Sequence, residues 1–134
     1  MRVTIDFLTD NGLKLPIQHK ECIQGLLYKH MAPATGKFLH DNGYIGPTGR
    51  IFKMWTFSNI HAKLCHDTRS NTFIIPSKFS LTIASAYEST IIELASNLMN
   101  EEVVLNNVQL KVEKMSVNRD NVTKDTLRFR TLSP

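Results

Sequence analysis

Apolar and polar residues alternate along several stretches of this chain, and a period of two is typical of strands with one buried face. The first stretch covers residues 2–8 and ends at the turn Asp10-Asn11-Gly12. Residues 73–84 are extended but interrupted at Pro76, so they are predicted to form two short strands around a bend. A third alternating stretch covers 108–113, after Val103-Val104-Leu105 and a polar Asn106-Asn107 pair. The apolar positions that these strands would bury are Val3, Ile5, Phe7, Phe79, Leu81, Ile83, Val108, Leu110 and Val112.

Two other segments carry apolar residues at helical spacing. The first, residues 18–31, is stopped by Ala32-Pro33. The second begins at Ser85-Ala86-Tyr87-Glu88, which has the pattern of a capping box. The predicted buried stripes are Cys22, Ile23, Leu26, Leu27 and His30 or Met31 in the first helix, and Tyr87, Ile91, Leu94, Ala95 and Leu98 in the second.

The segments between these elements complete a mixed order of strands and helices. Residues 51–58 are β-branched and aromatic and predict a strand, whereas 59–71 and 118–126 are polar and predict loops, and a short extended piece at 127–132 ends the chain. The resulting order is strand, helix, strand, strand, helix, strand. It predicts one α+β domain over 1–134 with the ferredoxin-like (split βαβ, RRM-like) fold, in which two helices cover one face of an antiparallel sheet.

Composition indicates an ordinary globular domain. The 134 residues are 42% hydrophobic and 21% charged, and no apolar run approaches the roughly 18 residues that would span a bilayer. The N-terminus alternates like a strand and lacks the apolar core of a signal peptide, so we expect a cytoplasmic protein with no membrane partner. Cys22 and Cys65 fall in unrelated segments, which indicates buried thiols and no disulfide framework.

Positive charge is concentrated in one part of the sequence. The formal net charge is +4, yet residues 14–78 contain nine Lys or Arg residues and only three acidic residues. All five histidines lie in this window too, at positions 19, 30, 40, 61 and 66. Such a basic half is typical of proteins that bind phosphate-rich partners, and a basic surface kept for solubility is the alternative.

Candidate chemistry gathers between residues 38 and 58. His40 follows an apolar pair and precedes Asp41-Asn42-Gly43, three residues that end a helical turn and reverse the chain. Glycines at 43, 46 and 49 predict a mobile loop that carries Arg50. In a regular strand Lys53 would share a face with apolar neighbours, an unfavourable place for an ammonium unless that end is open to solvent or to a ligand. Those neighbours are Ile51, Trp55 and Phe57.

Five features along the chain occur in an order that is specific when taken together. They are the N-terminal strand followed by Leu15-Pro16, then Gln24-Gly25-Leu26-Leu27-Tyr28, Phe38-Leu39-His40-Asp41-Asn42-Gly43-Tyr44, Phe52-Lys53-Met54-Trp55-Thr56-Phe57-Ser58 and Thr131-Leu132-Ser133-Pro134. In this order the chain resembles the CRISPR-associated endoribonucleases of the sixth Cas family, which process repeat-containing precursor RNA into guide RNAs. The resemblance covers the family's first ferredoxin-like half, and members usually continue into a second one. It therefore implies either an N-terminal piece of a longer protein or a natural half-length relative.

The resemblance implies a metal-independent cut of CRISPR repeat RNA, in which the RNA's own 2′-hydroxyl attacks the adjacent phosphate and leaves a 2′,3′-cyclic phosphate. His40, Tyr28 and Lys53 match the family's catalytic histidine, tyrosine and lysine. Imidazole exchanges protons near neutral pH, and a lysine stabilises charge that builds on a phosphate. No cofactor and no metal are implied. The candidate RNA contacts in the basic half are Lys29, Lys37 and Arg50.

Several alternatives remain open from the sequence. His40 could cap a helical turn, Tyr28 could be a core or boundary aromatic residue, and Arg50 could be a plain loop charge. Three residues have spacings that could ligate zinc, although no fourth ligand is evident nearby: His61, Cys65 and His66. A non-catalytic RNA-binding or assembly module of the same fold is the alternative function, and a domain acting only through protein contacts is a third. Repeat RNA, as precursor and as processed guide, is the implied partner, while a CRISPR effector complex and a second copy of the chain stay open as further partners.

Overall fold

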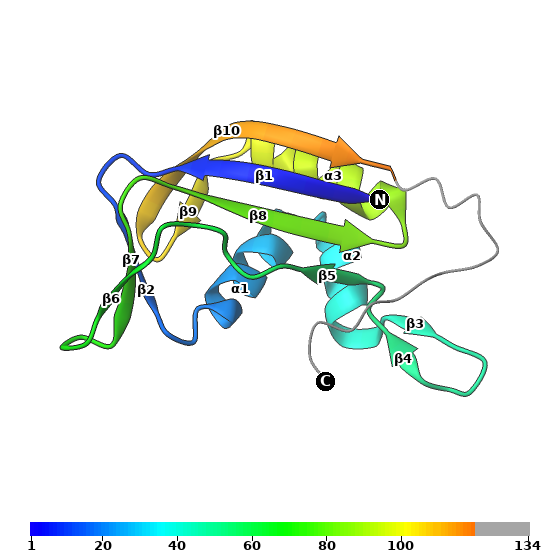
Figure 1. The fold of residues 1–134 in the computed structure, drawn as a ribbon. Coiled ribbons are helices and arrows are strands. Elements are labelled where there is room, and N and C mark those ends of the chain that lie inside the picture. Colours follow the sequence, from blue (N-terminus) through cyan, green and yellow to red (C-terminus); the bar gives the residue numbers. More distant parts are fainter. Residues whose placement is uncertain (120–134) are drawn as a thin grey trace, which may run out of the picture.

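A computed structural model describes residues 1–119, and in it five antiparallel strands form the main sheet (Figure 1). From one edge to the other the order is β5-β8-β1-β10-β9. The strands are β5 (Trp55–Phe57), β8 (Lys78–Ser85), β1 (Arg2–Leu8), β10 (Val108–Asn118) and β9 (Val103–Leu105). Without the β9 edge this is the strand order of the ferredoxin-like fold, because the first strand lies between the third and the last. The predicted fold class is confirmed.

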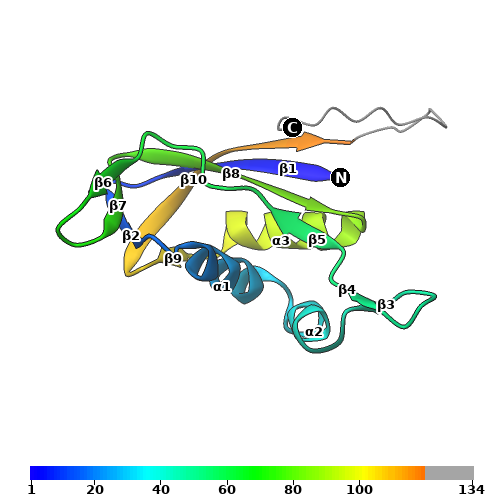
Figure 2. The same ribbon diagram turned by 60° about the horizontal axis from the view of Figure 1, so that its bottom comes forward.

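The helices lie together on one side of this sheet, as Figure 2 shows. They are α1 (Lys20–His30), the short α2 (Pro33–Lys37) and α3 (Glu88–Asn100). The alternation in β1 and β8 turns its apolar residues toward α1 and α3, and Phe7 stacks on Phe79 at a ring-centroid distance of 5.0 Å. The other face of the sheet is polar at its centre, where the hydroxyls of Thr4 and Thr82 lie 2.9 Å apart. The core therefore lies between sheet and helices, as the hydrophobic pattern predicts.

Two smaller sheets flank the main one. A three-stranded sheet has the order β2-β7-β6, and a hairpin joins β3 to β4. Their bounds are β2 (Leu13–Pro16), β6 (Cys65–Asp67), β7 (Thr72–Ile75), β3 (Tyr44–Ile45) and β4 (Ile51–Phe52). The prediction of a loop over 59–71 is wrong, because this segment contains β6 and a bridge from His61 to Ser80. Both pairings are made by backbone groups, which a polar composition does not reveal.

The predicted strand over 51–58 is also wrong as a single element. It divides into β4 and β5 at Met54, whose φ of 57° lies in the left-handed region. The carbonyl of Met54 accepts hydrogen bonds from the hydroxyl of Ser85 and the backbone N–H of Ala86, at 3.0 Å each. The break removes the regular alternation on which the predicted face of Lys53, Trp55 and Phe57 depended.

The same contacts correct the predicted start of the second helix. Ser85 is the last residue of β8, and α3 begins at Glu88 with Tyr87 as its N-cap and no side-chain capping bond. Ser85 is therefore used to hold the Met54 kink, and its hydroxyl also accepts the N–H of Tyr87. The ring of Tyr87 is 40% exposed and stacks on Tyr44 at 4.4 Å, so Tyr87 does not belong to the buried stripe.

Other expectations have mixed outcomes. Cys22 and Cys65 are both free thiols, but only Cys22 is half-buried and Cys65 is exposed, so the prediction of a buried thiol is wrong for Cys65. The extended piece at 127–132, most of the loop at 118–126 and the closing motif 131–134 lie outside the described residues. Within residues 1–119, no helix is both long enough and apolar enough to cross a membrane.

Candidate active site

The chain between α1 and β3 consists of two short helical pieces. Pro33 opens α2, as suits a residue with no N–H at the first helical position, and the π-helix η1 (Phe38–Asn42) follows directly. The N–H of Gly43 closes the π turn on the carbonyl of Phe38 at 2.7 Å. A Cβ on Gly43, whose φ is +71°, would lie 2.8 Å from the carbonyl oxygen of Phe52, so only glycine fits. The sequence predicts the end of this turn correctly, but not its π geometry or α2.

Two side chains of helix α3 hold this segment through hydrogen bonds. The carboxylate of Glu93 accepts the backbone N–H of Ala32 at 2.5 Å and the hydroxyl of Thr35 at 3.2 Å. One turn later, Asn97 donates its side-chain amide to the carbonyl of His30 at 2.8 Å. These bonds satisfy polar groups at the end of α1 and the start of α2, and they fix the segment that carries His40.

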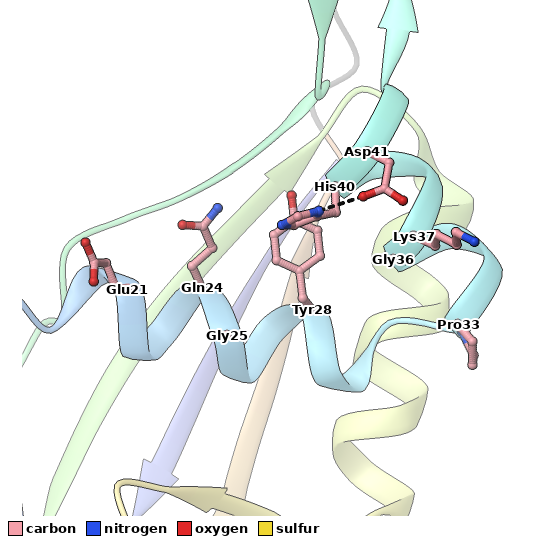
Figure 3. A pocket seen from close by; sticks show the side chains of 9 residues that line it. All are labelled: Glu21, Gln24, Gly25, Tyr28, Pro33, Gly36, Lys37, His40 and Asp41. Carbon is pink, nitrogen blue, oxygen red and sulfur yellow. Dashed lines mark hydrogen bonds and ion pairs between the residues drawn. The ribbon is translucent and has the colours of Figure 1, made fainter.

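His40 extends from η1 into solvent, with 73% of its side chain exposed. Its Nδ1 lies 2.8 Å from a carboxylate oxygen of Asp41 (Figure 3). If Nδ1–H donates this bond, the other ring nitrogen is left as a proton acceptor. A carboxylate in this position orients an imidazole ring. In the sequence Asp41 is recognisable only as part of a turn, although its place beside His40 is a signal for this pairing.

Tyr28 and Lys53 reach His40 from two different elements. The ring of Tyr28, on α1, meets the imidazole edge to face at a centroid distance of 5.7 Å, and it meets the ring of Trp55 in the same way at 5.2 Å. Lys53 follows β4 and donates from Nζ to the backbone carbonyl of His40 at 2.7 Å. The structure thus brings Tyr28, His40 and Lys53 together, with Lys53 bound to the main chain of His40 and not to its ring.

A pocket of about 570 Å³ opens beside these rings. It is lined by α1, α2 and η1, and its residues are Glu21, Gln24, Gly25, Tyr28, Pro33, Gly36, Lys37, His40 and Asp41 (Figure 3). Of the predicted RNA contacts only Lys37 lines it, whereas Lys29 on α1 and Arg50 in the β3–β4 hairpin are exposed elsewhere. Gln24 and Gly25 belong to one of the motifs that carry the family resemblance, but their residue types alone predict no role for either of them.

The zinc alternative receives no geometric support from residues 1–119, which contain no group of three His, Cys, Asp or Glu side chains placed to hold a metal ion. Cys65 and His66 are neighbours in β6, so their side chains point to opposite faces of the strand. The ring of His66 lies instead against Phe73, with centroids 5.4 Å apart.

No protein-family model matches the sequence, and no curated protein matches it. Solved structures do share its fold. One is described as "CRISPR associated protein Cas6" (TM-score 0.62, 22% identity) and another as "An RAMP protein binding different RNA substrates" (0.66, 22%). A third is a Cas6-related protein from Pyrococcus furiosus (0.67, 20%), and Cmr1 from the same organism is a more distant match (0.53, 9%).

The first three matches cover 89% of this chain and 48% of the other chain. The chain therefore spans about half the length of the solved structures it matches. At 20–22% identity the likeness establishes a shared fold. The fold that the sequence resemblance implies is confirmed.

Proposed function

We propose that this chain belongs to the CRISPR-associated endoribonucleases that process repeat RNA, as one ferredoxin-like half of such an enzyme, and that its candidate site cuts RNA. The observation that carries this proposal is the exposed imidazole of His40, paired with Asp41 and in contact with the phenol of Tyr28. The fold shared with a Cas6 protein and with a protein that binds different RNA substrates supports RNA as the substrate.

The proposed reaction needs only proton transfer and charge stabilisation. The 2′-oxygen forms a bond to the adjacent phosphorus while the bond from phosphorus to the 5′-oxygen breaks, giving a 2′,3′-cyclic phosphate and a 5′-hydroxyl. One proton leaves the 2′-hydroxyl and one reaches the 5′-oxygen. His40 would perform one of these transfers, and the hydroxyl of Tyr28, whose ring contacts that of His40, is the candidate for the other.

Lys53 would supply positive charge next to the reacting phosphate. An ammonium has three donors, and the bond to the carbonyl of His40 uses one of them. The other two can reach a non-bridging phosphate oxygen, where they would stabilise developing negative charge. Lys37 extends the positive surface at the pocket, and Lys29 and Arg50 are proposed as phosphate contacts farther along the RNA.

A 2′-deoxy substitution tests the chemistry directly. The full chain is incubated with the CRISPR repeat RNA of the genome that encodes it, in excess chelator, and the product ends are analysed. We expect cleavage that leaves a 2′,3′-cyclic phosphate, and we expect RNA with a 2′-deoxy nucleotide at the cut to bind equally well and stay intact. Cleavage of the 2′-deoxy RNA, or cleavage that stops with the chelator, would overturn the mechanism.

An RNA-binding module that does not cut is the second candidate. It is favoured by the fold shared with the protein described only as binding different RNA substrates. The same experiment separates the two functions, because such a module would bind both RNAs with salt-dependent affinity and cleave neither.

A further inference from the structure

Gly25 occupies an unfavourable position for a glycine. It lies in the interior of α1, where glycine is less favourable than any ordinary residue except proline. A Cβ added there would meet no atom within 4 Å, and no positive φ requires a glycine. Folding of the described residues therefore does not explain Gly25, since alanine would fit and would favour the helix.

Gly43 and Gly46 beside the site are explained by close packing. A Cβ on Gly43 would lie 2.8 Å from the carbonyl oxygen of Phe52, and one on Gly46 would lie 2.7 Å from the ring of Phe52. A Cβ on Gly36 would make only ordinary contact, 3.4 Å from the carbonyl oxygen of Tyr28. The space above Gly25 is instead the open pocket. A glycine that faces an open pocket allows a ligand to approach the helix backbone closely.

The pocket also has two chemically different ends. Glu21 and Gln24 lie one turn apart on α1 at one end, while Lys37, His40 and Asp41 lie toward the other (Figure 3). The carboxylate of Asp41 is paired there with the imidazole of His40, at 2.8 Å, whereas the carboxylate of Glu21 has no such partner among residues 1–119. A phosphate is favoured near the cation and disfavoured near the carboxylate of Glu21. The carboxylate is an acceptor only and the amide of Gln24 is both donor and acceptor, so this end suits the edge of a base that carries an amino group.

We propose that the pocket seats one nucleotide of the RNA, the one next to the cut, with its base between Glu21 and Gln24 and its sugar in van der Waals contact with the backbone at Gly25. The proposal rests on the function proposed above and adds a residue that sets specificity. The pocket volume of about 570 Å³ falls within the range of about 300–1,000 Å³ typical of small-ligand sites. Adenine, cytosine and guanine carry an amino group that could donate a hydrogen bond to the carboxylate of Glu21, and uracil carries none.

Substitutions of increasing size at Gly25 test whether a nucleotide contacts the helix backbone there. Gly25→Ala and Gly25→Leu are made in the full chain, and binding of 2′-deoxy repeat RNA and the melting temperature are measured. We expect both variants to melt about 2–5 °C higher, because both residues favour a helix. RNA affinity should fall about tenfold for Gly25→Ala and further for Gly25→Leu. The control Ser89→Ala, at an exposed position of α3 outside the pocket, should leave affinity unchanged.

A base substitution tests the specificity. Uracil placed next to the cut should weaken binding to the wild-type chain, and Glu21→Ala should reduce the difference between bases. If Gly25→Leu binds as tightly as the wild type, the seat is wrong, whatever the outcome of the cleavage test. If the chain binds RNA without cutting it, the proposed cleavage function fails. The Gly25 variants then still test whether a nucleotide of the bound RNA contacts the helix backbone at Gly25. If the wild type binds no RNA, both proposals fail.

Discussion

The main sheet and the segment that carries the candidate site are built on different principles. β1 and β8 pair over seven consecutive residue pairs without a break, and their inward residues Val3, Ile5 and Leu81 are fully buried. The site segment, residues 32–55, consists of a five-residue helix, a π turn, two strands of two residues and a kink at Met54. Its large side chains Ile45, Ile51 and Phe52 are 77%, 59% and 45% exposed.

The main sheet stabilises the fold, whereas the site segment presents the candidate catalytic side chains. The sheet is stabilised by burial of apolar surface, which needs no particular partner. The site segment buries little and is instead held by side-chain hydrogen bonds from α3 and β8, made by Glu93 and Ser85. In the sheet, the cost of a mutation to stability should therefore depend on how much buried side-chain volume it removes. In the site segment, it should depend on which hydrogen bond is lost.

The largest effect is expected in the sheet core. Phe79→Ala removes a ring that is 2% exposed and stacked on Phe7, so we expect it to lower the free energy of unfolding by about 3–5 kcal/mol. Phe52→Ala, the matched change in the site segment, should cost about 1 kcal/mol or less. Chemical denaturation measures both, and equal costs would contradict the distinction between the two regions.

A smaller effect is expected at the anchor of the site segment. Glu93→Ala leaves the N–H of Ala32 and the hydroxyl of Thr35 without their acceptor and should cost about 1–3 kcal/mol. Amide hydrogen exchange should accelerate over residues 32–43 and change little in β1 and β8. Glu102→Ala, an exposed acid beyond the end of α3, is the control and should leave exchange unchanged. If hydrogen exchange accelerated equally in β1 and β8, the site segment and the sheet would unfold together, and the distinction between them would be wrong.

The smallest effect is expected at the kink. Met54 is 39% exposed and has a positive φ, which costs a residue with a Cβ about 1–2 kcal/mol. Met54→Gly relieves that strain and should be more stable than Met54→Ala, which keeps the strain and removes the same side chain beyond Cβ. Thermal melting of the two variants gives the comparison. A Met54→Ala chain as stable as Met54→Gly would mean that the kink stores no strain.

The sheet and the helices that cover it could be predicted from the sequence. Each strand and helix buries one face, so its apolar residues recur with a period of two in the strands and close to four in the helices. The site segment could be predicted only in part. The turn at Asp41-Asn42-Gly43 was recognisable from its residue types, and the resemblance identified His40, Tyr28 and Lys53 as a set. Lys53 lies between β4 and the Met54 kink, and Gly43 lies against Phe52; neither the kink nor this contact follows from local preference.

Ser85 illustrates why local patterns can mislead. It matches the first position of a capping box, yet its hydroxyl is used by the carbonyl of Met54, a residue 31 positions away. The hydrogen bond that Ser85 makes to Met54 is a tertiary one, and it is possible because β5 pairs with β8. The pocket could not be predicted for the same reason, since Gln24 and Gly25 line it only because α2 and η1 lie beside α1.

The central claim is that His40 transfers a proton during RNA cleavage. The most direct test is the single-turnover cleavage rate of the repeat RNA by the wild-type chain and by His40→Ala, with RNA affinity measured alongside. We predict that the rate falls by about 10²–10⁴-fold while the affinity stays nearly constant. A His40→Ala chain that cuts as fast as the wild type would contradict the account.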